Sequence, residues 1–397
     1  MIKREIVPIR QTQKNSIKFY WSVSEMIRIA TAFSGIGAIE YALKKLKKKH
    51  RIIFACDNGE RILEKDRTEI EKEIANMSDI EAQNYIKKLY LDTGKPNLMK
   101  ESYFANYDIS EEQWYEDIRF LNAKKYKNQI DLFVGGSPCQ SFSVNGKRYG
   151  LKDIRGTLFY EFARIIEESQ PKTFIYENVK GMLTHDNGKT WEIVKSIFKK
   201  LNYNIYIQQK EDGKENPILN AKDYGIPQNR ERLFIVGFRN DLGINSFEFP
   251  KKKKLTKTIF EFLDENVDSK YYLGQKGFDF VTTHPSRAQV SEPIMRTQKA
   301  NQQFNWNGDF VFVPLCRVEQ DQKIMQRAYI SEWKGQEGVI RRITPRECLR
   351  LMGFKDDFKI VMNDTNMYRQ SGNSIVVNVL MELVKSIEKT GVWEKHD

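Results

Sequence analysis

The sequence predicts an α/β fold, in which a mostly parallel sheet carries helices on both faces and is joined to a second, smaller domain of irregular β structure. Apolar strand-like runs alternate with helical repeats over residues 27–240, which is the pattern of parallel strands connected by helices. After Pro250 the pattern changes, because a run of four lysines is followed by short, poorly periodic segments rich in Gln, Asn, Thr and Arg. A chain of 397 residues is long enough for two such domains.

The first elements are a strand, a glycine turn and a helix. Residues 27–33 form an apolar run, residues 34–38 contain two glycines, and apolar side chains recur at helical spacing over residues 39–46. A second apolar strand, residues 51–56, runs directly into Asp57. We therefore expect Asp57 at the edge of the sheet that also carries the glycine turn.

The same alternation resumes after an interruption. Residues 58–118 are charged and helix-prone, and we expect them to be an insertion rather than part of the repeating core. The elements expected after it are a strand at 129–134, a helix at 158–168, a strand at 173–176, a helix at 191–201 and strands at 203–208 and 232–238.

Two helix starts are predicted in the C-terminal part. Residues 344–347, Thr-Pro-Arg-Glu, combine an N-cap threonine, a first-turn proline and a capping-box glutamate, and Gly353 provides a stop. The Asn-Ser pair at 373–374 is expected to open an apolar helix at 375–387. The predicted parts of the chain are an N-terminal arm (1–26), a first domain that contains the insertion (27–244), a second domain (245–338) and a C-terminal segment that returns to the first domain (339–397).

Charge and composition narrow the class of protein. Lys and Arg number 65 against 53 Asp and Glu, and the net charge of +12 favours a polyanionic partner such as nucleic acid, although a lysine-rich solvated surface would give the same balance. The chain has no apolar run long enough to span a membrane, and its first residues lack a secretion signal, so we expect a cytoplasmic protein. None of the four cysteines has the spacing of a metal ligand, and no metal site is predicted.

The glycine turn favours a nucleoside cofactor. Gly35 and Gly37 let the backbone approach a ligand, and Asp57, 20 residues after Gly37, can accept hydrogen bonds from ribose hydroxyls. The third glycine of a dinucleotide fingerprint is replaced by Glu40, and a carboxylate is poorly suited to a pyrophosphate. A nucleoside without phosphates therefore fits better, and a plain tight turn is the alternative.

Cys139 is the predicted nucleophile. It follows a strand, after Pro138, at the rim where open α/β sheets bind ligands. Cys56 instead lies within an apolar strand and Cys348 within an amphipathic helix, and both are expected to fill the core. The glycine-rich loop at 144–157 that follows resembles a lid closing on a phosphate backbone, unless it is an ordinary solvated loop. Its basic residues are Lys147, Arg148, Lys152 and Arg155.

A carboxyl group and two arginines are predicted at the same rim. Glu177 ends the next strand, and Arg230 and Arg232 precede or begin another. A thiol, a carboxyl and a guanidinium suit attack on an electron-poor ring, in which the thiolate adds, the acid protonates a ring nitrogen and arginine orients the ring. A Cys-His hydrolase is disfavoured, because none of the four histidines stands in a nucleophile-partner motif.

In this order the motifs resemble those of the DNA cytosine-5 methyltransferases, particularly the bacterial restriction-modification type. The resemblance covers about residues 27–57, 115–240 and 340–390. The runs that carry it are Phe33-Ser34-Gly35-Ile36-Gly37, Gly136-Ser137-Pro138-Cys139-Gln140-Ser141-Phe142-Ser143, Glu177-Asn178-Val179, Gln228-Asn229-Arg230-Glu231-Arg232 and Gln370-Ser371-Gly372-Asn373-Ser374.

The resemblance implies a fold, a cofactor and a reaction. The first domain would be the Rossmann-like catalytic domain of an S-adenosylmethionine-dependent methyltransferase, the second would recognise the target, and S-adenosylhomocysteine would be the product. Cys139 would attack C6 of a cytosine flipped out of the duplex, Glu177 would bind N3 and the exocyclic amine, and Arg232 would contact the ring with support from Arg230. The implied cofactor residues are Phe33, Ser34, Gly35, Ile36, Gly37, Asp57 (ribose), Asp117 and Ile118 (adenine), Pro138, Leu158, Asn373 and Ser374. The implied DNA-binding residues are Gln140, Ser141, Ser143, Lys147, Arg148, Lys152 and Arg155.

Three features depart from the family pattern: Asn58 stands where an aromatic residue is common, Glu116 replaces a common glycine, and the insertion at 58–118 has no assigned role. In the second domain, several arginines and amides could read base edges, and the alternative is that most of them simply face water. These are Arg287, Arg296, Gln298, Asn301, Gln302, Gln303, Arg317 and Arg327.

Two other functions remain open. The same chemistry on RNA would use similar motifs, although the relative to compare usually has Pro-Cys-Thr where this chain has Pro-Cys-Gln at 138–140. A non-catalytic DNA-binding regulator would need neither the cysteine nor the glutamate. The favoured interpretation implies double-stranded DNA as the partner, a cognate restriction endonuclease acting separately, a monomeric chain and no membrane association.

Overall fold

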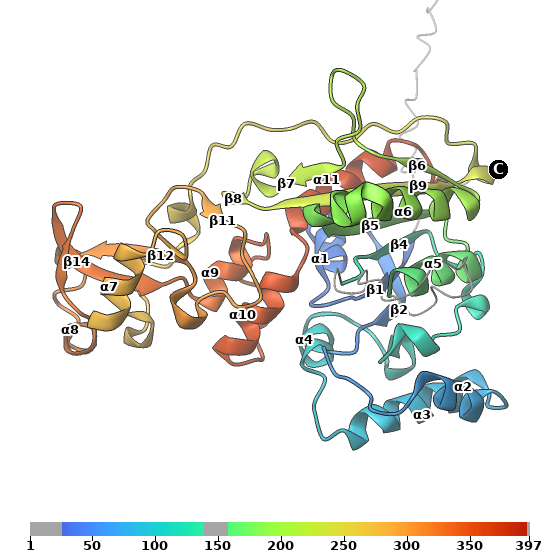
Figure 1. The fold of residues 1–397 in the computed structure, drawn as a ribbon, viewed down its shortest axis with the longest axis horizontal. Helices are drawn as coiled ribbons and strands as arrows, with labels where there is room; N and C mark the ends of the chain where they lie inside the picture. The colour runs from blue at the N-terminus through green and yellow to red at the C-terminus, as the bar shows by residue number, and fades with distance from the viewer. Residues whose placement is uncertain (1–25, 139–157, 395–397) are drawn as a thin grey trace, which may run out of the picture.

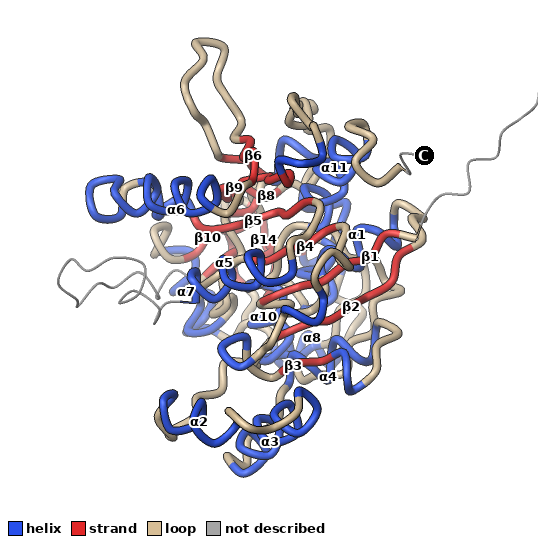
Figure 2. Tube along the Cα trace, turned by 90° about the vertical axis from the view of Figure 1, so that its right-hand side faces the viewer, coloured by secondary structure: helices blue, strands red, loops and turns tan. Residues whose placement is uncertain are grey.

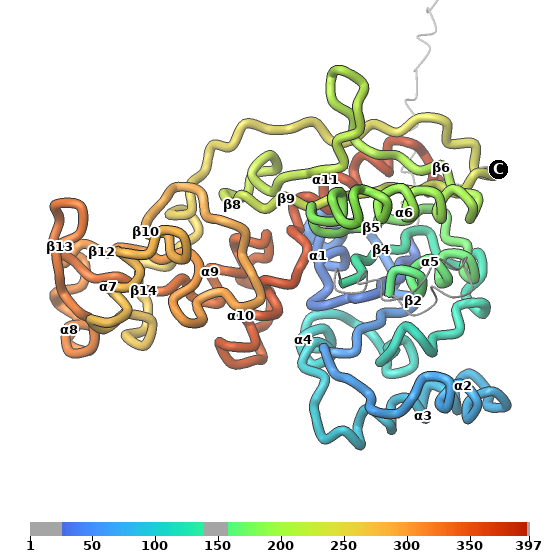
Figure 3. The backbone as a smooth tube through the Cα atoms, viewed as in Figure 1, coloured from blue at the N-terminus to red at the C-terminus, as the bar shows by residue number. Residues whose placement is uncertain are grey.

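The computed structural model of the protein describes residues 26–138 and 158–394. It has a large lobe, built on an eight-stranded sheet, and a small lobe, built on a four-stranded sheet (Figure 1). A long segment after β9 runs from the large lobe to the small lobe, and the chain returns through two helices that lie between the lobes (Figure 3). No helix in the described part of the chain is both long and apolar enough to cross a membrane.

The main sheet is mostly parallel, as predicted. Its first five strands in space are parallel neighbours, whereas β9 runs antiparallel to β5, β6 and β7. The apolar pattern of residues 232–238 predicts the strand but not its reversed direction. In spatial order the strands are β3 (Trp114–Tyr115), β2 (His50–Cys56), β1 (Ile27–Ala32), β4 (Leu132–Gly135), β5 (Thr173–Val179), β9 (Glu231–Arg239) and β6 (Tyr203–Tyr206), with β7 (Ile218–Asn220) also paired to β9.

Helices cover both faces of this sheet (Figure 2). Along β4, Leu132 and Val134 join the apolar cluster of α1 and α11, and Phe133 joins the cluster of α5 and α6 on the other face. The ring of Phe133 stacks on that of Phe162, with centroids 4.7 Å apart. A strand buried on both faces needs a continuous apolar run, which is why these strands stand out in the sequence. The helices are α1 (Ala38–Lys45), α11 (Val377–Glu388), α5 (Leu158–Ser169) and α6 (Lys189–Lys200).

The segment 58–118 consists of two parts. Helices α2 (Arg67–Ile74) and α3 (Asp79–Asp92) lie outside the sheet around their own small apolar cluster, below the large lobe in Figure 1. Helix α4 (Leu98–Asn106) instead packs Met99 and Tyr103 into the main core, and β3 extends the main sheet. The second part of the expected insertion therefore belongs to the sheet and its core.

The small lobe has the irregular β structure that the sequence predicts. Its sheet has the order β10-β12-β14-β13, with one parallel and two antiparallel pairings. Two short helices, α7 (Gln275–Thr283) and α8 (Gln322–Arg327), accompany the sheet. The strands are β10 (Ala288–Val290), β12 (Gly308–Pro314), β13 (Ser331–Trp333) and β14 (Gln336–Arg342).

The lobes meet at a two-stranded parallel sheet of β8 (Gln228–Asn229) and β11 (Met295–Arg296) and at helices α9 (Pro345–Arg350) and α10 (Asp364–Asn373). Helix α9 begins with both hydrogen bonds of the predicted capping box. Helix α10 was not predicted, and Asn373 is its last residue rather than the start of the following helix, which begins at Val377.

Candidate active site

The predicted site residues gather at the carboxyl ends of the parallel strands. The β1–α1 turn, Asp57 after β2, Gly136 and Pro138 after β4, and Glu177 on β5 all lie at this edge, because parallel strands point their carboxyl ends the same way. Several predicted residues lie outside the described part of the chain: Cys139, Gln140, Ser141, Ser143, Lys147, Arg148, Lys152 and Arg155.

Glu177 and Arg232 form an ion pair, as expected if both serve the same ring. The Arg232 Nε atom lies 3.1 Å from Glu177 Oε1, and both side chains are mostly buried. Arg232 faces Val179 across the antiparallel pair, so the two charged residues are diagonal neighbours on one face of the sheet. Burial raises the pKa of Glu177, and the nearby guanidiniums of Arg232 and Arg230 only partly oppose this.

The loop that leads to Cys139 is fixed by the same strand. Asn178, which is buried, donates from Nδ2 to the Ser137 carbonyl at 2.9 Å and to the Tyr176 hydroxyl at 2.9 Å. At Gly136 an added Cβ would lie 2.6 Å from Glu177 Oε2 and 2.8 Å from the Glu177 carbonyl oxygen, and the backbone contact favours glycine here. The sequence motif contains Asn178, but nothing in the motif shows that its amide holds the preceding loop.

Arg230 connects three segments. Its guanidinium is buried and donates to the carbonyls of Gln298 (2.6 Å), Gly372 (3.0 Å) and Ser374 (2.8 Å). Burial, together with repulsion from Arg232, lowers the pKa of Arg230 to about 9. The arginine therefore joins the small lobe to the end of α10.

The glycine turn is held by Asp57. Gly35 and Gly37 have positive φ angles of 54° and 75°, which favour glycine. The Gly35 amide donates to Asp57 Oδ2 at 2.8 Å and the Gly59 amide donates to Oδ1 at 2.8 Å. Burial raises the pKa of Asp57, and these two amides oppose the shift. Ser34 Oγ accepts from the Cys56 amide at 2.9 Å, which ties the turn to β2.

A small cavity lies between this turn and the connection from α10 to α11. Its walls include the predicted residues Phe33, Ser34, Gly35, Ile36, Asn373 and Ser374. Glu40 also lines it and is fully buried, with Oε1 accepting from Tyr103 at 2.6 Å and from Thr31 at 3.2 Å. Burial raises the pKa of Glu40 to about 7. The sequence marked Glu40 only as a residue unsuited to a phosphate.

Asp117 and Ile118 lie after β3, beside the end of β2. Asp117 Oδ2 accepts a hydrogen bond from Tyr90 of α3 at 2.7 Å and forms an ion pair with Arg119 at 2.6 Å. Ile118 is buried, and Leu158 at the start of α5 is half-buried. Tyr90 comes from the expected insertion and has no sequence signal that would link it to the site.

The base-reading prediction is wrong for three amides in the small lobe. Gln298, Gln302 and Gln303 are buried, with exposed fractions of 0%, 2% and 4%, so their side chains face the protein. Arg296 is half-buried, and its guanidinium donates to carbonyl groups of its own lobe. The exposed candidates are Arg287, Asn301, Arg317 and Arg327.

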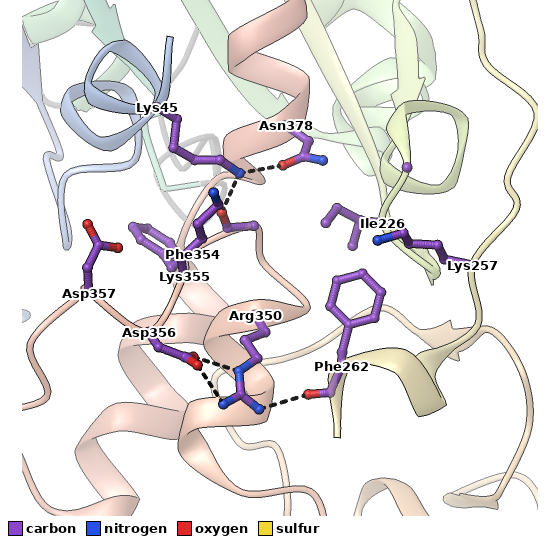
Figure 4. A pocket seen from close by; sticks show the side chains of 12 residues that line it. Lys45, Ile226, Lys257, Phe262, Arg350, Phe354, Lys355, Asp356, Asp357 and Asn378 are labelled. Atoms are coloured by element: carbon purple, nitrogen blue, oxygen red, sulfur yellow. Dashed lines mark hydrogen bonds and ion pairs between the residues drawn. The ribbon is translucent and has the colours of Figure 1, made fainter. Parts of the chain in front are cut away.

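A larger cavity, of about 720 Å³, lies away from this edge (Figure 4). It opens beside Lys45, at the far end of α1 from the glycine turn. The Lys45 amine donates to the Gly353 carbonyl at 3.0 Å and to Asn378 Oδ1 at 3.3 Å, and Arg350 pairs with Asp356. Lys45 and Arg350 are thus paired with neighbouring acceptors, and none of the predicted site residues lines the cavity. Among the described residues, no group of three or more His, Cys, Asp or Glu side chains could hold a metal ion.

Comparison with known proteins confirms the resemblance. The family model for C-5 cytosine-specific DNA methylase matches residues 90–389. The chain is 36% identical over 293 residues to the Type II methyltransferase M.SsoII of Shigella sonnei, covering 73% of this chain and 71% of that protein. It is 34% identical over 277 residues to the Type II methyltransferase M.HhaI of Haemophilus parahaemolyticus, covering 68% and 79%.

A solved structure shows the same fold. The Dnmt2 methyltransferase of S. pombe superposes with a TM-score of 0.59 at 20% identity, over 91% of this chain and 98% of that one. The sequence relatives and the motifs at the edge of the sheet are consistent with this fold. The chain therefore belongs to the C-5 cytosine-specific DNA methylase family.

Proposed function

We propose that the protein transfers a methyl group from S-adenosylmethionine to C5 of a cytosine in duplex DNA, through a covalent bond between Cys139 and C6. The observation that carries this proposal is the position of Glu177. Its carboxyl group is buried at the end of β5, paired with Arg232 at 3.1 Å, and packed against the loop that leads to Cys139. A carboxyl with a raised pKa is suited to protonate a ring nitrogen near neutral pH.

The chain's own residues create the nucleophilic carbon. The Cys139 thiolate bonds to C6 while Glu177 gives a proton to N3, so the electron pair of the C5–C6 bond becomes available at C5. Arg232 orients the ring and keeps the Glu177 carboxyl in place. Bound S-adenosylmethionine supplies an electrophilic methyl group to this carbon. Transfer of the C5 proton to solvent water leaves its electron pair to re-form the C5–C6 double bond, which breaks the C6–sulfur bond and restores the thiolate. N3 then returns its proton to Glu177.

The residues around the β1–α1 turn fit this cofactor. Asp57 accepts one amide hydrogen bond on each oxygen and retains lone pairs for two ribose hydroxyls. A Cβ added at Gly35 would meet nothing nearer than 4.0 Å, so the backbone there is open to a ligand. Ile118 and Leu158 offer apolar surface for adenine, and the cavity beside Asn373 and Ser374 suits the methionine end. The buried carboxyl of Glu40 argues against a phosphate at this place.

Duplex DNA is the proposed substrate, and the target base must leave the helix because C6 is hidden in a stacked pair. The net charge of +12 favours such a polyanion. Relatives with the name Type II methyltransferase support a role in restriction-modification. A cognate restriction endonuclease that acts separately is part of the proposal. We further propose that the chain works as a monomer in the cytoplasm and releases S-adenosylhomocysteine.

Covalent trapping tests the proposal. Bisulfite sequencing of plasmid DNA from cells that express the protein first identifies the methylated site. A duplex with 5-fluorocytosine at that site should then form an adduct that needs the cofactor and survives denaturing electrophoresis, because fluorine cannot leave C5 as a proton. Cys139→Ala should abolish the adduct, whereas Cys316→Ala, which removes an exposed thiol, should keep it.

The alternatives give different results in this test. Methylation of RNA without methylation of DNA would replace the substrate, and DNA binding without any methylation would identify a regulator. An adduct formed by Cys139→Ala would refute the covalent mechanism.

A further inference from the structure

The segment between β2 and β3 reaches back to the acids at the ends of these strands. Tyr90, on α3, is fully buried, and its hydroxyl donates to Asp117 Oδ2 at 2.7 Å. Burial and the neighbouring Asp117 carboxylate raise the pKa of Tyr90, so the hydroxyl keeps its proton and remains a donor. Helix α3, which belongs to the expected insertion, therefore contacts Asp117, a residue of the proposed cofactor site.

Arg61 connects Tyr90 to the next acid. Its guanidinium lies over the Tyr90 ring, with Cζ 4.5 Å from the centroid, and forms a buried ion pair with Glu116. Its Nε donates to the Asn58 carbonyl at 2.8 Å. The two positions at which this chain departs from the family pattern, Asn58 and Glu116, are thus both bonded to Arg61.

Asn97 completes the connection to the ribose acid. Its side-chain nitrogen donates to the Asp57 carbonyl at 2.8 Å and to Glu116 Oε2 at 2.8 Å. At Gly59, a Cβ would lie 2.4 Å from Asn97 Oδ1, so this contact is close. The ends of β2 and β3 are therefore joined by side chains that come from the segment between them.

We propose that Tyr90 is a positioning residue for the cofactor. Its hydroxyl, together with the ion pair from Arg119, holds the Asp117 carboxylate where the adenine amine binds. Arg61 and Asn97 keep the neighbouring ends of β2 and β3, with Asp57 and Asp117, in register. The proposal rests on the proposed function, because it assumes that Asp117 accepts from the adenine amine. The segment 58–118 would then help the protein to bind an adenine nucleoside in preference to one without the adenine amine.

The test compares two nucleosides that differ only at the adenine amine. Calorimetry measures the affinity of the full chain for S-adenosylhomocysteine and for S-inosylhomocysteine, in which a carbonyl oxygen replaces the amine. Wild type should prefer the adenosine form. Tyr90→Phe should weaken binding of the adenosine form by about five- to tenfold, as expected for one lost hydrogen bond, and leave the inosine form nearly unchanged. The ring stays in place under Arg61, so α3 should remain packed.

Tyr85→Phe is the matched control. It makes the same change on the same helix, at a hydroxyl that bonds to Glu73 at the surface. Neither affinity should change in this variant. In turnover, Tyr90→Phe should raise KM for S-adenosylmethionine and leave kcat at saturation unchanged.

Three results would overturn the positioning role. They are equal losses of affinity for both nucleosides in Tyr90→Phe, no loss of affinity for either nucleoside in Tyr90→Phe, and a wild type that does not discriminate between them. Failure of the proposed function is distinct from these, because wild type would then bind neither nucleoside.

Discussion

The Nε atom of Arg232 lies 3.1 Å from Oε1 of Glu177, across the antiparallel pair of β5 and β9. Such a pair normally lowers the pKa of a carboxyl group, yet burial outweighs it and the pKa of Glu177 is raised. Arg232 fixes the position of the Glu177 carboxyl group, and burial favours its protonated form. The two effects together give a carboxyl that is both oriented and able to donate a proton.

Glu177→Gln should slow methyl transfer by about 100-fold or more, because an amide is a poor proton donor to N3. Binding to duplex DNA should change little, since the carboxyl lies inside the site and contributes little to backbone affinity. Single-turnover methyl incorporation and a binding titration measure the two quantities. Glu215→Gln, which changes an exposed carboxylate paired with Lys195, is the control. Equal rates for wild type and Glu177→Gln would exclude the acid role.

Gly136→Ala should reduce both activity and stability. The new Cβ would lie 2.6 Å from Glu177 Oε2 and 2.8 Å from the Glu177 carbonyl oxygen, and the backbone contact cannot move aside easily. Overpacking of this kind typically costs about 1–3 kcal/mol. Thermal unfolding should show a lower midpoint than in Gly181→Ala, because an added Cβ at Gly181 meets nothing within 4 Å. Equal midpoints would mean that the loop relaxes without cost.

Glu40→Gln should change how stability depends on pH. The pKa of Glu40 is raised by burial to about 7, from an ordinary value of 4.5, while Tyr103 and Tyr107 beside it keep their protons because burial raises their pKa as well. Between these two pH values the unfolded chain has lost a proton that the folded chain retains. Stability therefore falls as the pH rises, by about 3 kcal/mol in total.

Glutamine has no proton to lose in this pH range, so the pH-dependent loss of stability that Glu40 causes is absent in the variant. The thermal midpoint of Glu40→Gln relative to wild type should rise from pH 5 to pH 7 and then level off. The amide oxygen can still accept from Tyr103 and Thr31, so the packing is kept. Midpoints that stay parallel over this range would show that Glu40 is ionised at all of these pH values.

Arg230→Lys should loosen the contact between the lobes. An ammonium group cannot span the three carbonyls that the planar guanidinium reaches, and each lost charged bond typically costs about 1.5–3 kcal/mol. Hydrogen–deuterium exchange of residues 295–299 should become faster, together with a lower thermal midpoint. Arg346→Lys is the control, because that guanidinium donates to a single carbonyl, that of Lys355. An unchanged exchange rate at residues 295–299 would mean that residues other than Arg230 hold the two lobes together.

Local patterns were enough to predict most strands and part of the site. The apolar runs of β1, β2, β4 and β5 are buried on both faces, so composition alone marks them, and the acids that follow them fall at the same edge of the sheet. The positions of Asp57 and Glu177 at this edge could be predicted for this reason. The capping box at Thr344 was predictable because it uses only contacts within one turn.

The remaining features depend on contacts between residues far apart in sequence. Tyr90 meets Asp117 across 27 residues, and Arg230 meets Gly372 across 142, and no periodicity records either contact. Asn373 was misplaced because an N-cap residue and the last residue of a helix can have the same amino-acid type. The antiparallel direction of β9 could not be predicted, because an apolar run has the same pattern in either direction.

The close approach of Gly372 to the small lobe limits which small lobes the large lobe can accept. A Cβ at Gly372 would lie 2.2 Å from the Lys299 carbonyl oxygen, and the neighbouring Gln298 amide donates to Ser371 at 2.5 Å. A small lobe grafted from a relative must therefore bring a 295–299 backbone that fits this glycine and Arg230. Chimeras whose junctions lie outside residues 295–299, so that the recipient keeps its own segment there, would not disturb this contact.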